Sequence, residues 1–236
     1  MFIPWLSGLL LLTVLAAAPL AFAAPGATEV GAARWAVGGA FALAPAILVA
    51  VRRWLRYAAD ARLIRGDGEF ARRDYSKAIG SYEAAIALGR RANHETSAAW
   101  YGKGAALVAL GQTGEGIAAL DHALALNPED EVAWINKGTA LTRLGRMNDA
   151  LRCFNAAIKV NAAYEVAWNN KGNALARLGK HEGALACYER ALEIDPAYRT
   201  AWVNKGFLLA KLGRFDDAAQ CADAALRLGA QDAARG

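Results

Sequence analysis

The 236-residue chain contains little of several residue types that define particular protein classes. Three cysteines are too few for a secreted scaffold held by disulfides, and six prolines do not indicate a low-complexity chain. The three histidines make no metal-ligand spacing with one another or with cysteine. No phosphate-binding loop, nucleophile elbow or dinucleotide fingerprint occurs. The sequence therefore predicts no enzyme, no metal site and no cofactor.

An excess of charge of one sign occurs in only one short stretch. Residues 97–232 carry 15 basic and 15 acidic side chains, although the whole chain has a net charge of +5. The basic excess is concentrated between Arg52 and Lys77, which contain eight basic residues against four acidic ones. Because the larger part of the chain is neutral, we do not expect it to bind nucleic acid.

Two long apolar runs precede the basic cluster. Residues 2–23 carry no charge, and as a helix they would cover roughly 33 Å, enough for a bilayer core. Residues 1–23 are therefore a first transmembrane helix or, given Ala21-Phe22-Ala23 after Pro19, a cleaved signal peptide. Both alternatives stay open, and residues 24–34 follow as a short external loop.

The second run, residues 35–51, is bounded by Arg34 and by Arg52-Arg53. Its 17 residues are at the short end of what spans a bilayer, and an interfacial or buried helix is the alternative. We expect a transmembrane helix that leads into a basic juxtamembrane segment, residues 52–58. The basic side of a span faces the cytoplasm, so the sequence predicts a cell-membrane protein whose remaining residues are cytoplasmic.

An internal repeat is the strongest pattern in the chain. The strings AWYGKG, AWINKG, AWNNKG and AWVNKG begin at residues 99, 133, 167 and 201, always 34 residues apart. They define four units, 97–130, 131–164, 165–198 and 199–232, and leave 233–236 as a tail. Equivalent positions in the units are called columns below, with column 1 at the first residue of each unit.

Each unit is expected to contain two helices. Trp at column 4, Gly at column 8 and Leu at column 11 lie on one helical face. The glycine at column 15 favours the left-handed backbone that ends many helices. A second helix follows, with Ala, an aromatic residue and Ala at helical spacing, as in Ala184, Tyr188 and Ala191. Small residues allow the helix backbones to approach one another, and the large ones fill the gaps between them.

This pattern resembles the tetratricopeptide repeat (TPR) family. The resemblance implies an all-α fold, a right-handed α-solenoid of stacked helix-turn-helix repeats, preceded here by one or two transmembrane helices. A degenerate first repeat covers residues 59–96; Arg62 replaces its Trp, and four extra residues follow it. The last repeat also departs from the pattern, since Ala222 replaces the aromatic residue and Ala230 the proline. We expect its outer face to be uncapped.

The resemblance further implies that the first helices line a concave groove that binds protein or peptide. At 100° per residue, columns 2, 6, 9 and 13 lie opposite the packed stripe. From these columns we select the following candidate groove residues: Asn136, Asn170, Asn204, Asn173, Thr139, Phe207, Arg143, Arg177 and Lys211. The unit 97–130 contributes only Ala and Gly to the same columns.

The asparagine row predicts contact with a main chain, because an amide offers both a donor and an acceptor. The basic row favours an acidic partner. The competing interpretation is that both rows are merely solvated. The predicted function is a membrane-anchored scaffold that binds an extended peptide segment, and the alternative is self-assembly into a homo-oligomer through the uncapped last repeat. The lysines at column 7 and the cysteines at column 23 are expected to be structural.

Overall fold

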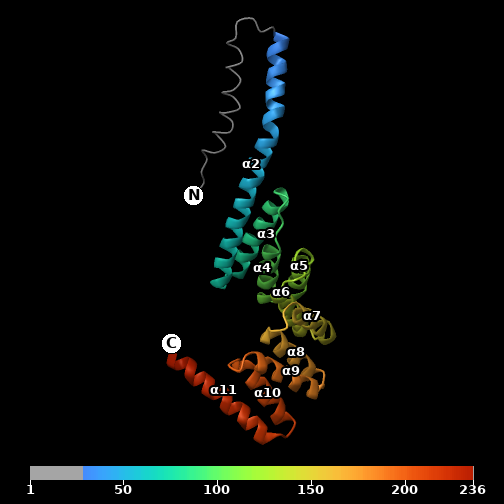
Figure 1. Ribbon diagram of the computed structural model, residues 1–236, viewed down its shortest axis with the longest axis vertical. Coiled ribbons are helices and arrows are strands. Elements are labelled where there is room, and N and C mark those ends of the chain that lie inside the picture. Colours follow the sequence, from blue (N-terminus) through green and yellow to red (C-terminus); the bar gives the residue numbers. More distant parts are fainter. Residues whose placement is uncertain (1–28, 236) are drawn as a thin grey trace.

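The computed structural model describes residues 29–235, and this part of the chain contains ten helices and no strand. The first helices of the five repeats are the end of α2 (Glu29–Ala71), α4 (Ser97–Ala109), α6 (Glu131–Arg143), α8 (Glu165–Arg177) and α10 (Arg199–Lys211). The second helices are α3 (Tyr75–Arg91), α5 (Thr113–Leu126), α7 (Met147–Val160), α9 (His181–Ile194) and α11 (Phe215–Arg235). The ten follow one another along the long axis of the molecule (Figure 1).

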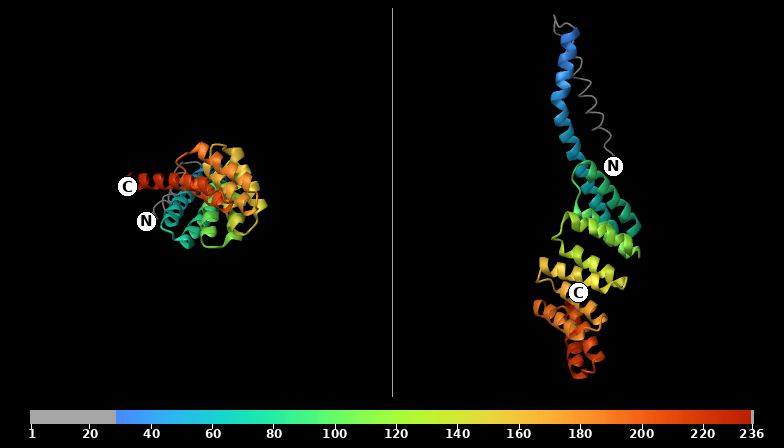
Figure 2. Two further views of the ribbon diagram at one scale, coloured as in Figure 1. Left: turned by 90° about the horizontal axis from the view of Figure 1, so that it is seen from below. Right: turned by 90° about the vertical axis from the view of Figure 1, so that its right-hand side faces the viewer.

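Helices contact mainly their neighbours in the sequence, as expected of a solenoid. The first and second helices of a repeat pack together, and each second helix packs on the first helix of the next repeat. Views from the side and from one end show the resulting stack, with α2 and α11 at opposite ends (Figure 2). The predicted all-α solenoid of helix pairs is confirmed.

In the units 131–164 and 165–198, the aromatic residue of the second helix requires the glycine at column 8. A Cβ atom on Gly138 would lie 2.5 Å from Cε1 of Phe154, and one on Gly172 would lie 2.6 Å from Cε1 of Tyr188. These distances are shorter than any van der Waals contact, so only glycine fits there. The ring fills the notch that the missing side chain leaves, and Phe154 and Tyr188 are consequently buried.

The glycines of column 15 and the tryptophans of column 4 stabilise the turns between helices. The glycines at column 15 all have positive φ, between +74° and +85°, which confirms the predicted left-handed helix ends. The indole N–H of each Trp in the last three repeats donates to a carbonyl in the turn six residues before it. The pairs are Trp134 to Pro128 (2.9 Å), Trp168 to Ala162 (3.0 Å) and Trp202 to Pro196 (2.9 Å).

The N-terminal boundaries predicted from the sequence differ from the structure. Helix α2 runs without a break from Glu29 to Ala71, so the expected loop end, span, juxtamembrane segment and first repeat share one helix. Within residues 29–235 no helix is long and apolar enough to cross a membrane, so the transmembrane helix expected at 35–51 is not supported. Residues 1–23 lie outside the described part of the chain.

The last boundary also differs. Helix α11 continues to Arg235, past the predicted end of the repeat at residue 232 and into the expected tail. The earlier second helices each have 14 residues from α5 to α9 and stop before a turn, whereas α11 has 21. Ala230 stands where two earlier units have proline, so nothing in the local sequence ends the helix there.

Candidate functional site

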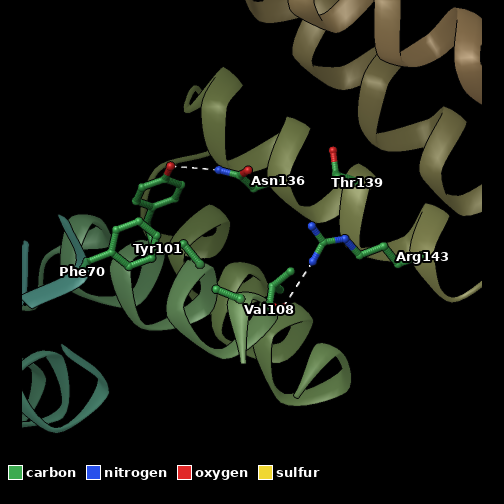
Figure 3. A pocket seen from close by; sticks show the side chains of 8 residues that line it. Phe70, Tyr101, Val108, Asn136, Thr139 and Arg143 are labelled. Atoms are coloured by element: carbon green, nitrogen blue, oxygen red, sulfur yellow. Dashed lines mark hydrogen bonds between the residues drawn. The ribbon is translucent and has the colours of Figure 1, made fainter. Parts of the chain in front are cut away.

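A first hollow lies between the first helices of the first three repeats (Figure 3). Its volume is about 330 Å³. The lining comes from α2, α4 and α6: Phe70, Tyr101, Ala105, Val108, Ala109, Asn136, Thr139 and Arg143. Aromatic and aliphatic side chains form one wall, and the amide, hydroxyl and guanidinium groups of α6 form the other.

A second hollow of about 440 Å³ lies between the first helices of the last three repeats. It is lined by Thr142, Asn173, Ala176, Arg177, Tyr188, Asn204, Phe207, Leu208 and Lys211. Phe207 is 76% exposed, which leaves a large apolar surface on the groove wall. Like the first hollow, it combines apolar surface with amides and cations.

The structure brings together eight of the nine residues selected from the sequence. Asn136, Thr139 and Arg143 line the first hollow. Asn173, Arg177, Asn204, Phe207 and Lys211 line the second. Asn170 lines neither and is half-buried between them. Residues of columns 6, 9 and 13 therefore line hollows between successive first helices.

The asparagine amides are not all free, contrary to the expectation that each would meet a bound main chain. Nδ2 of Asn136 donates to the hydroxyl of Tyr101 (2.8 Å), and Nδ2 of Asn204 donates to Oδ1 of Asn169 (2.8 Å). Both bonds join column 6 to column 5 of the preceding repeat, 35 residues earlier. They connect neighbouring repeats and use one donor of each amide.

Asn170 lacks such a bond because the residue 35 positions before it is Ile135, whose side chain cannot accept a hydrogen bond. Its Oδ1 has only a long contact of 3.5 Å from Nδ2 of the buried Asn169. Asn170 is therefore the member of the row whose amide hydrogens are least committed within the protein.

Asn173 is oriented by the core. The buried hydroxyl of Tyr188 donates to Oδ1 of Asn173 at 2.7 Å. Burial raises the pKa of Tyr188 to about 12, so the phenol stays protonated and keeps donating. Because Oδ1 accepts this bond, the two hydrogens on Nδ2 of Asn173 remain for a ligand in the second hollow.

The two arginines of the groove each hold the end of a neighbouring helix. Nη1 of Arg143 donates to the carbonyl of Val108 at 3.3 Å, and Nη1 of Arg177 donates to that of Thr142 at 3.2 Å. Both acceptors lie in the last turn of the preceding first helix, where a cation is favoured. Each guanidinium has further N–H groups and is exposed, so it can also bind a carboxylate.

The lining is cationic. Arg143 in the first hollow and Arg177 and Lys211 in the second are its charged residues, and no acidic residue lines either hollow. A carboxylate brought into this groove would therefore meet cations and amide donors with no opposing charge close by.

The lysines of column 7 face away from the groove, toward the preceding second helix. They form ion pairs between Lys103 and Glu83 (2.8 Å), Lys137 and Asp121 (2.5 Å), and Lys205 and Glu189 (2.9 Å). The acids occupy column 25, where the unit preceding Lys171 has Asn155, so Lys171 forms no such pair. Like Lys103 and Lys137, it lies over the tryptophan of its own helix, 5.1 Å from the ring centroid of Trp168. The predicted structural role fits these contacts.

Sequence reasoning missed several lining residues. Phe70, Val108, Thr142 and Ala176 occupy column 12, and Tyr101 occupies column 5. These columns lie at the edge of the face that was considered. Taking the groove arc from column 5 to column 13 would have included them.

The cysteines show no sign of chemistry. Cys153, Cys187 and Cys221 are buried free thiols, and burial raises the pKa of each. A thiol whose charged form is disfavoured is a weak nucleophile. Among residues 29–235, no group of three His, Cys, Asp or Glu side chains could hold a metal ion.

Solved structures with a similar fold include MamA, PilF and YrrB. MamA from Desulfovibrio magneticus RS-1 shares 20% identity over 74% of this chain and 96% of its own, with a TM-score of 0.64. PilF of Pseudomonas aeruginosa shares 17% over 73% and 77%, with a TM-score of 0.66. YrrB, described as a TPR protein with an unusual peptide-binding site, shares 23% over 71% and 84%, with a TM-score of 0.56. No curated protein matches the sequence.

Models of the tetratricopeptide repeat match residues 97–140, 132–164, 166–198 and 200–231. Together these segments cover more than half of the chain and coincide with the four regular units. The chain therefore belongs to the tetratricopeptide repeat family.

Proposed function

We propose that this protein is an interaction scaffold whose concave groove binds an extended, acidic segment of a partner protein. The observation that carries the proposal is the lining of the two hollows, where Arg143, Arg177 and Lys211 stand beside amide groups with no acidic residue. The proposed role requires no catalytic group and no cofactor.

The geometry supports an extended ligand more than a compact one. The hollows are separate and lie along a row of first helices, so a bound segment must reach from one to the other. Between them, Asn170 offers its amide to a passing main chain. The exposed ring of Phe207 would pack against an apolar side chain of the same ligand. YrrB, with a similar fold, is described as binding peptide.

Photo-crosslinking tests the proposal directly. A benzophenone amino acid at position 207, in the groove, should capture a partner that the same probe at exposed position 126, at the end of α5, does not. The captured protein is identified by mass spectrometry, and a peptide from its crosslinked segment is then synthesised. The proposal predicts that this segment is acidic; an uncharged or basic segment would contradict it.

Charge variants complete the test. Arg177→Gln with Lys211→Gln should weaken binding of the peptide about tenfold or more, and the loss should shrink at high salt. The matched control is Lys159→Gln with Lys180→Gln, which removes the same charge from exposed positions outside both hollows. Equal losses in the two variants would show that net charge, and not the groove, governs binding.

Membrane attachment and a cytoplasmic location also belong to this proposal. Their support is the uncharged run at residues 2–23 and the basic excess that begins at Arg52. Protease treatment of intact cells and of opened vesicles tests both. A repeat region cut in intact cells, or one that does not sediment with membranes, would contradict the proposal.

A further inference from the structure

The last repeat leaves uncovered the surface that earlier repeats use for stacking. Leu185, Tyr188 and Leu192 on α9 are buried, and they cluster with residues of α10. The same columns on α11 are Ala219, Ala222 and Leu226, all exposed, and Leu226 is 70% exposed. With Phe215 they form an apolar stripe at helical spacing that no residue in the described part covers.

The first repeat has the complementary surface uncovered. Columns 3 and 10 of each later first helix pack on the preceding second helix and are at most 3% exposed. These residues are Ala99, Ala106, Ala133, Ala140, Ala167, Ala174, Ala201 and Leu208. With column 1 of the first repeat at residue 59, the same columns of α2 hold Ala61, which is exposed, and Gly68, which is half-buried. Tyr57 (74% exposed) and Ile64 (70%) continue the stripe.

The two ends also carry the basic and acidic residues of an ion pair that recurs between neighbouring repeats. Within the chain, column 7 of a first helix pairs with an acid on the preceding second helix, as in Lys205 with Glu189. At the free ends this column holds Arg65 on α2, and the acid column holds Asp223 on α11. Asp223 is exposed and forms no ion pair in the described structure, and the side chain of Arg65 is 62% exposed.

The net charges of the ends agree with this pairing. Residues 52–71 of α2 contain five arginines and three acidic residues, whereas residues 215–235 of α11 contain four aspartates and two arginines. Opposite charge on two surfaces steers them together and selects their register.

We propose that a second copy of this chain docks its α2 on α11 of the first, so that copies stack head to tail as consecutive repeats do. Ala61 then packs on Leu226, Gly68 on Ala222, and Arg65 pairs with Asp223. Consecutive helices in the array run roughly antiparallel, so the long free ends of α2 and α11 lie side by side. The contact uses different surfaces on the two copies, so it forms a ring or an open chain of copies.

This stacking is independent of the proposed groove ligand, because none of the residues that line the hollows belongs to the two end surfaces on α2 and α11. Of these two helices only α2 contributes to a hollow, through Phe70. The groove variants Arg177→Gln and Lys211→Gln should therefore leave self-association unchanged. Failure of one proposal does not imply failure of the other.

Sedimentation velocity of the full-length chain, kept in one mild detergent, tests the stacking. The wild type should gain mass with concentration. Asp223→Arg alone and Arg65→Glu alone should each weaken association about tenfold or more, since like charges then face each other. An equimolar mixture of the two variants should associate again, because every contact between unlike copies joins opposite charges. Glu182→Arg, at an exposed acid of α9 outside the end surfaces, is the matched control.

Arg65 also pairs with Glu69 in its own helix, so its replacement could disturb the fold. Ala61→Arg and Ala222→Arg avoid this problem, since both alanines are exposed in the single chain. Each should abolish association while circular dichroism shows an unchanged helix content. A wild type that stays monomeric at its highest soluble concentration, a mixture that does not associate, or association that survives Ala222→Arg would each overturn the proposal.

Discussion

The hydroxyl of Tyr188 donates to Oδ1 of Asn173 at 2.7 Å, and this bond connects the core of the fourth repeat to its groove. Tyr188 is 2% exposed, while Asn173 lines the second hollow. A buried aromatic residue therefore decides which amide atoms a ligand can meet. The same residue fills the notch at Gly172, so packing and recognition share one side chain.

Alkaline pH should weaken the fold through Tyr188. Its pKa is about 12 in the folded protein and near 10 when unfolded, so the unfolded state releases the proton first. Stability from this residue is present below pH 10 and is lost as the pH rises toward 12. Urea unfolding midpoints at about pH 8 and about pH 11 measure the loss. Tyr188→Phe should start roughly 1 kcal/mol less stable at pH 8 but fall less between the two pH values.

Two groove asparagines, Asn170 and Asn204, should separate stability from binding. Asn204→Ala removes the donor to the buried Asn169 and should cost about 1 kcal/mol of unfolding free energy. Asn170→Ala breaks only a long contact, so its cost should be a few tenths of a kcal/mol at most. Binding of the captured peptide should show the opposite order, with Asn170→Ala weakening it more than Asn204→Ala. Urea denaturation and fluorescence titration measure the two effects, and a larger stability loss in Asn170→Ala would contradict the assignment.

Glycine to alanine substitutions at two helical positions should change the stability of the protein in opposite directions. Gly138→Ala forces its Cβ into the Phe154 ring and should destabilise the protein by about 1–3 kcal/mol. Gly183→Ala on α9 meets only an ordinary contact of 3.5 Å to Leu175, so it should stabilise by up to about 1 kcal/mol. Thermal melting of both variants checks the prediction. A double variant Gly138→Ala with Phe154→Leu should recover part of the loss if the clash is the cause.

The cysteines should react only when the chain opens. All three are buried, and burial raises their pKa values, so the native protein should react with a thiol reagent far more slowly than the unfolded one. Absorbance after addition of an aromatic disulfide, with and without urea, counts the accessible thiols. Fast reaction of any thiol in the native state would show that its repeat opens locally.

Much of the fold could be predicted from the sequence because the repeat is a local pattern. The spacing of Trp, Gly and Leu places α6 and α7 inside the unit 131–164, and the positive φ at Gly145 follows from its column. The groove columns followed from the same periodicity. These features depend on contacts within one helix pair, which one 34-residue period already contains.

The N-terminal boundaries could not be predicted in this way. An apolar run, a basic cluster and a degenerate repeat differ in composition, yet they join into one helix from Glu29 to Ala71. A change in composition does not by itself end a helix, because the backbone hydrogen bonds continue across it. Even Pro45, which lacks a backbone N–H, lies inside α2 without ending it.

The sequence by itself determined the helix pairs, their order and the face that each first helix turns inward, since spacing along the chain sets these. Only the tertiary structure decided which inward groups stay available. Asn136 and Asn204 are joined to side chains 35 residues earlier, whereas Asn170 is not, because Ile135 holds the matching place. Hydrogen bonds between repeats depend on how closely and at what angle successive helices pack, and no single period of the sequence contains that information.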